Sequence, residues 1–184
     1  MISSMLVIFA SLLGIDVLIK QQVEENIEPG EEKELAGGRI VIRKVYNRGF
    51  LMNILDGKPK VVRYATIVSG IGLLIWDILT FLPVRIIRTA RVDGKAGGIR
   101  LGIRRGPYLR QFGMTLLSAG AASNIFDRLV RGRVIDYIGI RTGERHLDRI
   151  TANLGDCFIA CGGLILMLRD LVCQLIIIPG RRTP

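Results

Sequence analysis

Four apolar blocks, each close to the ~20 residues that span the ~30 Å hydrocarbon core of a bilayer, constrain the fold of this 184-residue chain most. A soluble amphipathic helix carries an apolar stripe, whereas these apolar residues come in unbroken runs, which is typical of helices that face lipid. The first block has no preceding basic segment and no small-residue cleavage site, so it is predicted to be an uncleaved span and not a signal peptide. We therefore predict a single membrane domain over residues 1–184, with spans at about 1–20, 64–84, 111–130 and 150–168.

The loops between the blocks differ in charge, and this difference predicts the orientation of the chain. Residues 85–110 contain eight Lys or Arg residues and a single acid, Asp93, whereas residues 20–63 mix nine basic residues with seven acids. Because strongly basic loops stay in the cytoplasm, we expect loop 85–110 and both termini there, and loops 21–63 and 131–149 on the extracytoplasmic side. The basic loop is rich in glycine, so we expect it to be irregular.

The net charge of +10 raises the alternative of a nucleic-acid-binding protein. The surplus lies between apolar blocks and at the C-terminus, and no zinc-finger spacing, helix-turn-helix pattern or RNA-binding aromatic signature accompanies it. We therefore expect no nucleic-acid partner. Cys157, Cys161 and Cys173 lie in the last apolar region and are expected to pack as small apolar residues. His146 is expected to be a solvated loop residue, so no metal site is predicted.

The first extracytoplasmic loop carries a strand pattern. Residues Arg39 to Tyr46 alternate polar and β-branched side chains, and Gly37 and Gly38 before them are typical of a turn. We predict one or two short strands that lie on the membrane surface. The predicted fold is an all-α membrane protein, a four-transmembrane-helix bundle with a small β element in the first extracytoplasmic loop.

Polar residues inside the third block are candidates for function, because an ionisable residue is costly to keep within a membrane span. Asn124, Asp127 and Arg128 are spaced to share one face of a helix. Gly132 is expected to end that helix, and Asp136 follows in the extended segment VIDYI.

A second acid, Asp156, opens the fourth block and shares a helix face with Asn153. By the predicted topology Asp136 and Asp156 reach a similar depth, at the extracytoplasmic ends of their spans. Two close carboxylates share a proton because both cannot ionise cheaply. One can then activate a water molecule while the other protonates a peptide carbonyl, and no metal or cofactor is required. For Asp127 and Arg128 we favour the alternative of a satisfied ion-pair network at the helix end.

The stretch GAASNIFDRLVRGRVIDYI resembles the signature of lipoprotein signal peptidases, an N-x-x-D-R segment followed by G-x-V-x-D-[FY]. ANLGD is similar to that family's N-x-A-D element, DVLIK to its first-span D-x-x-x-K, and YNRGF to its N-x-G motif in the first outer loop. The resemblance implies that Asp136 and Asp156 are the catalytic dyad. It also implies that supporting residues surround the dyad and that others lie on the substrate side: Asn124, Asp127, Arg128 and Asn153 in the first group, and Asp16, Lys20, Asn47 and Gly49 in the second.

The implied activity is that of an aspartic endopeptidase that removes signal peptides from diacylglyceryl-modified prolipoproteins, cleaving just before the lipid-modified cysteine. The resemblance implies a multi-pass monomer in the bacterial cytoplasmic membrane, in contact with membrane lipid, with its site near the extracytoplasmic face and no cofactor. Four features depart from the family pattern: Gly155 replaces Ala, Thr151-Ala152 replace the aromatic residue before the Asn, Phe50-Leu51-Met52 replaces a small-small-Phe run, and the basic loop is long. These departures bear on substrate preference more than on chemistry, because neither acid is replaced.

Two other functions stay open at the level of sequence. A small transporter or proton-coupled channel also uses intramembrane acids, but such proteins tend to carry internal repeats, and the sequence shows none. A family member that has lost activity and only binds lipoproteins is the second alternative. Asp77, inside the second block, matches no family motif and has no assigned role.

Overall fold

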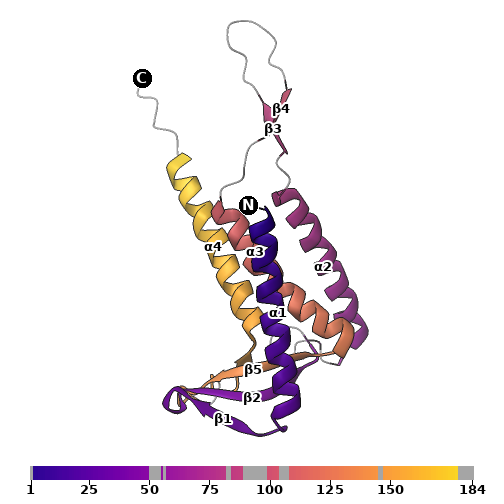
Figure 1. The fold of residues 1–184 in the computed structure, drawn as a ribbon, viewed down its shortest axis with the longest axis vertical. Coiled ribbons are helices and arrows are strands. Elements are labelled where there is room, and N and C mark those ends of the chain that lie inside the picture. The colour runs from indigo at the N-terminus through magenta and orange to yellow at the C-terminus, as the bar shows by residue number, and fades with distance from the viewer. Residues whose placement is uncertain are drawn as a thin grey trace, which may run out of the picture.

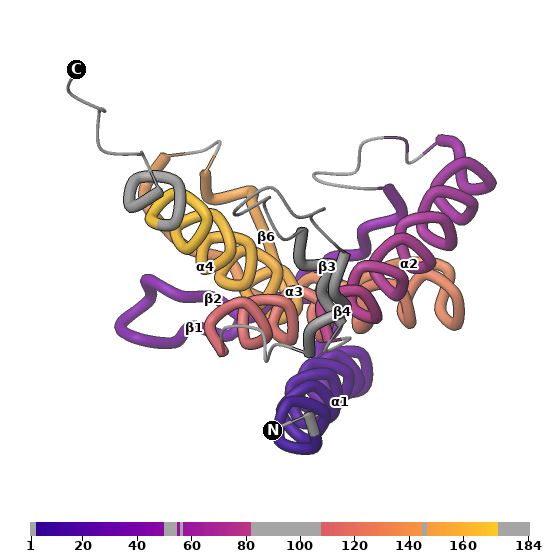
Figure 2. The backbone as a smooth tube through the Cα atoms, turned by 90° about the horizontal axis from the view of Figure 1, so that it is seen from above, coloured from indigo at the N-terminus to yellow at the C-terminus, as the bar shows by residue number. Residues whose placement is uncertain are grey.

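Four long helices form the frame of the protein. The computed structural model describes residues 2–49, 55, 57–81, 84–88, 99–103, 108–144 and 147–177. The helices are α1 (Ile2–Asn26), α2 (Pro59–Phe81), α3 (Tyr108–Phe126) and α4 (Leu154–Ile177). They run beside one another above a small sheet (Figure 1), and a view along them places α3 between α2 and α4, with α1 on one side (Figure 2). Two of them, α1 from Ser3 and α2, are long and apolar enough to cross a membrane by length and composition.

The distribution of side chains is the reverse of that in a soluble protein. Large apolar side chains point outward along the helices, for example Val68 at 69% and Leu79 at 65% exposure on α2. Asp16, Lys20 and Asp127, by contrast, are fully buried. Charged residues are almost never fully buried unless they are paired, and large exposed apolar patches mark surfaces that meet a partner or a membrane. The helices therefore present a surface suited to lipid, in agreement with the apolar blocks of the sequence.

A four-stranded antiparallel sheet lies at one end of the helices. Its order is β1 (Glu32–Leu35), β2 (Ile40–Asn47), β5 (Val134–Ile140) and β6 (Thr151–Ala152). Gly37 and Gly38, between β1 and β2, both adopt positive φ, which confirms the predicted turn and the β element between the first two helices. The extended segment predicted around Asp136 is also confirmed, but the sheet is larger than expected. β2 pairs along β5 with Val45 opposite Asp136, and this long-range pairing was not predicted.

A second pair of strands corrects the prediction for the basic loop. β3 (Val84–Arg88) and β4 (Ile99–Ile103) pair antiparallel over their full length. The expectation of an irregular loop is therefore wrong for these two segments. Their sequences, VRIIR and IRLGI, are rich in branched apolar residues that favour strands, a pattern that the surrounding glycines obscured. Residues 89–98 and 104–107 of the same loop lie outside the described residues.

Glycines allow α3 and α4 to approach each other at backbone distance. A Cβ built on Gly120 would lie less than 3.0 Å from the backbone oxygen of Gly155, and a Cβ on Gly162 less than 3.0 Å from the backbone oxygen of Gly113. Small residues at such positions let membrane helices pack closely. A Cβ on the neighbouring Gly163, by contrast, would meet open space. The contact between Gly120 and Gly155 brings the start of α4 against the polar part of α3.

We predict that Gly120→Ala lowers the free energy of unfolding by about 1–3 kcal/mol, because the added methyl group must displace the backbone of α4. Gly163→Ala is the matched control, since it adds the same methyl group to α4 in open space and raises helix propensity. Thermal unfolding in detergent micelles compares the two variants. Equal transition temperatures for Gly120→Ala and the unsubstituted protein would contradict the proposed backbone contact.

Candidate active site

Asp136 lies in β5, where the sheet meets the helices. A π-helical turn, Asp127–Arg131, continues α3, and Gly132 ends it at φ 73°, as predicted. The chain then enters β5 and buries Asp136, which is 5% exposed. Two amides donate to its carboxylate: Asn153 Nδ2 to Oδ1 at 2.7 Å and Asn47 Nδ2 to Oδ2 at 3.2 Å.

Asp156 lies in the first turn of α4, where its carboxylate takes part in the helix cap. The backbone N–H of Asp156 donates to Asn153 Oδ1 at 2.9 Å, and the backbone N–H of Asn153 donates to Asp156 Oδ2 at 3.2 Å. This reciprocal pair has the form of a capping box, which satisfies two N–H groups at the start of a helix. Asn124 Nδ2, from α3, donates to the other carboxylate oxygen at 2.8 Å. Asn153 therefore donates to both carboxylates, to Asp136 from its side-chain amide and to Asp156 from its backbone N–H.

The surroundings of Asp136 favour its neutral form. Burial, together with the negative charge of Asp156, raises the pKa of Asp136 from 3.8 to about 6, while the hydrogen bonds from Asn153 and Asn47 oppose this shift. Two acids that oppose each other's ionisation titrate as a pair. The arrangement can therefore hold a proton on one carboxyl group while the other is ionised. Within the described residues, no group of three or more His, Cys, Asp or Glu side chains is placed to hold a metal ion.

A cluster of buried charges adjoins the two acids. Lys20 Nζ lies 2.9 Å from Asp16 Oδ2 and 3.1 Å from Asp127 Oδ2, and all three residues are fully buried. Arg131 Nη1 pairs with the other carboxylate oxygen of Asp127 at 2.5 Å. Two cations thus compensate two anions, as buried charges require. Full burial leaves Asp16 and Lys20, which the family resemblance placed on the substrate side, without an exposed surface.

The other predicted residues occupy different positions around the acids. Asn124 and Asn153, expected to support the two acids, donate to Asp156 and Asp136 respectively. Asn47, expected on the substrate side, donates to Asp136 as well. Asp127 belongs to the ion-pair network, in agreement with the alternative that we favoured for it. Arg128 Nη2 donates to the backbone oxygen of Gly49 at 2.9 Å and so joins the π-helical turn after α3 to the segment between α1 and α2.

Three residues of the site were missed in the sequence. Ser123 Oγ donates to Asp16 Oδ2 at 2.6 Å, and the Tyr137 hydroxyl donates to Asp16 Oδ1 at 2.9 Å while it accepts from the backbone N–H of Leu154 at 3.1 Å. Burial raises the pKa of Tyr137, so its hydroxyl keeps its proton. The third is Arg131, which lies four positions after Asp127. This spacing predicts an ion pair on one helix face. Tyr137 could also have been found in the sequence, because it directly follows Asp136 in VIDYI.

Gly155, where the family resemblance led us to expect Ala, lies in a crowded part of the site. A Cβ there would be 2.8 Å from Asp16 Oδ2 and 3.0 Å from the backbone oxygen of Gly120. The charged network and α3 occupy the space that a methyl group would need. Phe50-Leu51-Met52 and His146 lie outside the described residues.

Asp77 is half-buried on α2 and accepts a hydrogen bond from Ser118 Oγ of α3 at 2.9 Å. The structure thus makes this residue, which matched no motif, a polar contact between two helices.

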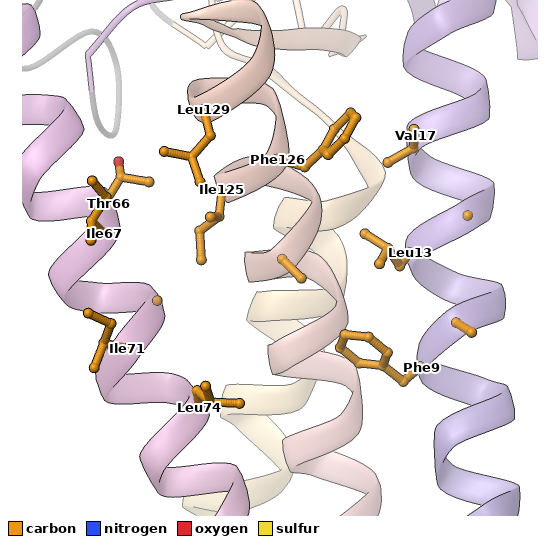
Figure 3. Close-up of a pocket in the computed structure, with 14 residues that line it drawn as sticks. Phe9, Leu13, Val17, Thr66, Ile67, Ile71, Leu74, Ile125, Phe126 and Leu129 are labelled. Carbon is orange, nitrogen blue, oxygen red and sulfur yellow. The ribbon is translucent and has the colours of Figure 1, made fainter.

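The face of α3 opposite the acids is apolar. Ile125 and Phe126 form part of the floor of a groove of about 780 Å³ between α1 and α2 (Figure 3). Leu13 of α1 and Ile71 of α2 are among the residues that form its walls. Residues three and four apart share a helix face, and the α3 residues that contact the acids and Lys20 belong to the other face. Helix α3 therefore separates this groove from the candidate site.

We predict that Asn47→Ala raises the pKa of Asp136 above about 6, because the lost hydrogen bond stabilises the ionised carboxylate. Infrared titration of the carboxyl band, identified by its loss in Asp136→Asn, measures the shift. Asn26→Ala is the control, because it removes an exposed amide that donates to the backbone oxygen of Gln22 within α1. A pKa that stays constant or falls in Asn47→Ala would show that this amide does not act on the carboxyl group.

Solved structures share this fold. Two chains, both described as bacterial membrane enzyme structures obtained by the in meso method, match with TM-scores of 0.74 and 0.69. The first is 20% identical, and its alignment covers 100% of this chain and 96% of the matched chain. The second is 22% identical, and its alignment covers 93% of this chain and 94% of the matched chain. At these identities the likeness concerns the fold.

Sequence relatives identify the family. The family model for signal peptidase (SPase) II matches residues 8–172. A lipoprotein signal peptidase of Caldicellulosiruptor bescii is 31% identical over 160 residues, which cover 87% of this chain and 85% of the relative. A lipoprotein signal peptidase of Streptococcus pneumoniae is 25% identical over 165 residues, 88% of each chain. The chain therefore belongs to the signal peptidase II family, and it is a peptidase.

Proposed function

We propose that this chain is a membrane aspartyl endopeptidase that removes signal peptides from diacylglyceryl-modified bacterial prolipoproteins by cleaving before the lipid-modified cysteine. The observation that carries this proposal is the pair of carboxyl groups held by Asn153. Asp136 and Asp156 come from different elements, share this partner, and differ in environment, with the pKa of Asp136 raised to about 6. Such a pair of unlike acids suits a division into proton donor and proton acceptor.

In the proposed reaction the ionised carboxylate, Asp156, takes a proton from a water molecule whose oxygen attacks the scissile carbonyl carbon. The protonated carboxyl group, Asp136, donates its proton to the carbonyl oxygen, which forms a neutral tetrahedral intermediate. The intermediate collapses when the C–N bond breaks. The leaving nitrogen takes up the proton held by Asp156, and the hydroxyl proton returns to Asp136. Both acids thus recover their starting states after one water is consumed.

The proposed membrane arrangement has four spans, with both termini in the cytoplasm. The lipid-suited surfaces of the helices support it, and the strongly basic loop 85–110 favours the cytoplasm for the end opposite the sheet. The sheet, and the acids beside it, would then lie at the extracytoplasmic face of the bacterial cytoplasmic membrane. A substrate whose lipid chains stay in the bilayer presents its modified cysteine at this depth. We propose that the protein acts as a monomer.

We predict that Asp136→Asn and Asp156→Asn each abolish cleavage of a purified diacylglyceryl-modified prolipoprotein. An amide can neither hold the shared proton nor accept one from water. Asp77→Asn is the matched control: it changes another intramembrane carboxyl group, one that bonds to Ser118, and should retain most of the activity. The assay scores the product whose first residue is the modified cysteine.

Full cleavage by either dyad variant would refute the assignment of the two acids. A protein that binds the precursor but never cleaves it would favour the lipoprotein-binding alternative over the peptidase. Proton or ion flux in reconstituted vesicles, without cleavage, would favour the transporter alternative.

The raised pKa of Asp136 predicts the pH dependence. The proton on this carboxyl group is present below about pH 6 and is lost above it, so kcat/KM should fall as the pH rises through about 6 with the slope of a single ionisation. Steady-state cleavage over a range of pH measures this fall in kcat/KM. Thermal unfolding at each pH checks that the protein stays folded. A rate that increases through this range would contradict the role of Asp136 as proton donor.

A further inference from the structure

The ammonium group of Lys20 is fully buried, and its close contacts are all acceptor oxygens. Nζ lies 2.9 Å from Asp16 Oδ2 and 3.1 Å from Asp127 Oδ2, and it donates to Ser123 Oγ at 3.0 Å and to Asn124 Oδ1 at 2.8 Å. An ammonium group has three hydrogens and no acceptor, so each atom turned towards it must be an acceptor. The shortest of these four contacts is the one to the Asn124 amide.

Asn124 lies between this cation and Asp156. Its Oδ1 accepts from Lys20 Nζ, while its Nδ2 donates to Asp156 Oδ1 at 2.8 Å. An amide turned by 180° has nearly the same shape, so its partners decide its orientation. In the turned state the NH₂ group would face the ammonium and the carbonyl oxygen would face the carboxylate, which makes two repulsive contacts. The cation and the carboxylate therefore select the same orientation from opposite sides.

We infer that Lys20 is a positioning residue of the peptidase, which holds the Asn124 amide as a hydrogen-bond donor to Asp156. This inference rests on the proposed dyad. A donor at Asp156 Oδ1 fixes the orientation of this carboxylate, which is the proton acceptor of the proposed reaction. Lys20 thus acts on the chemistry through Asn124, in place of the substrate-side role that the family resemblance implied.

The charge of the buried Lys20 ammonium is compensated by two carboxylates. Asp16 faces it from its own helix, and Asp127 faces it from the π-helical turn, where Arg131 neutralises the second carboxylate. The hydroxyl group of Tyr137, from β5, donates to Asp16. Buried ion pairs persist when their remaining lone pairs are satisfied by further hydrogen bonds, and each carboxylate here has such partners.

A double-mutant cycle between Lys20→Met and Asn124→Ala tests the inference. Each single variant should lower kcat by about 10- to 100-fold, the usual loss when a group that orients a catalytic residue is removed, with little change in KM. If Lys20 acts through Asn124, the double variant should be no slower than Asn124→Ala alone. Lys44→Met is the matched control, because its ammonium bonds to the backbone oxygen of Glu24, and it should leave kcat unchanged.

A second readout separates positioning from a merely structural role. The positive charge of Lys20 helps to hold down the pKa of Asp136, so the fall of kcat/KM with rising pH should move to higher pH in Lys20→Met. If this variant does not fold, the pH profile of the charge-compensated variant Lys20→Met/Asp127→Asn is compared with that of Asp127→Asn alone. The same shift to higher pH is expected.

Three results would overturn the inference. These are multiplicative losses in the cycle, an effect confined to KM, and an unchanged pH profile with a lowered unfolding temperature. Cleavage by Asp136→Asn and Asp156→Asn in the same assay would instead refute the proposed dyad. Inactive dyad variants combined with multiplicative losses would refute the role of Lys20 alone.

Discussion

The contacts of Asn153 are the interaction on which the candidate site depends. Its amide donates to Asp136, its backbone N–H donates to Asp156, and its side-chain oxygen caps the start of α4. Pairing of Ile138 with Ala152 brings the strand before Asn153 alongside β5, so the cap and the first acid are built together. Because buried polar groups must find partners, this residue couples the start of a helix to the arrangement of both carboxyl groups.

Helix α3 is the second constraint, because its two faces make different contacts. One face carries Gly120, which admits the backbone of α4, together with the polar side chains that reach Asp156 and Lys20. The opposite face is apolar and forms the floor of the groove between α1 and α2. Without the close glycine contact, α4 would stand farther from α3, and the hydrogen bond from Asn124 to Asp156 could not close at 2.8 Å. The packing of small residues and the geometry of the candidate site are therefore linked.

The buried charges follow from the same setting. Where water is scarce, a charged group persists only if opposite charges and hydrogen bonds replace its hydration. This condition is met by four residues together: Lys20, Arg131, Asp16 and Asp127. The removal of any one of them would leave a buried charge without its partner. The result is a polar interior within an apolar exterior. Such an interior can hold an amide in one orientation and two neighbouring acids in different protonation states.

The sequence alone predicts the helices, the strand that contains Asp136, the helix end at Gly132 and the two candidate acids, because apolar runs, turn residues and short motifs are local patterns. It did not reveal the pairing of β3 with β4, since glycines masked two short strand patterns. Which polar groups meet depends on the packing of the helices and the sheet. Asn47 and Asp136 are 89 positions apart, and Lys20 and Asn124 are 104 apart. Their contacts depend on how far each helix is rotated and how closely its neighbour can approach, and neither quantity is written in the spacing of residues along one segment.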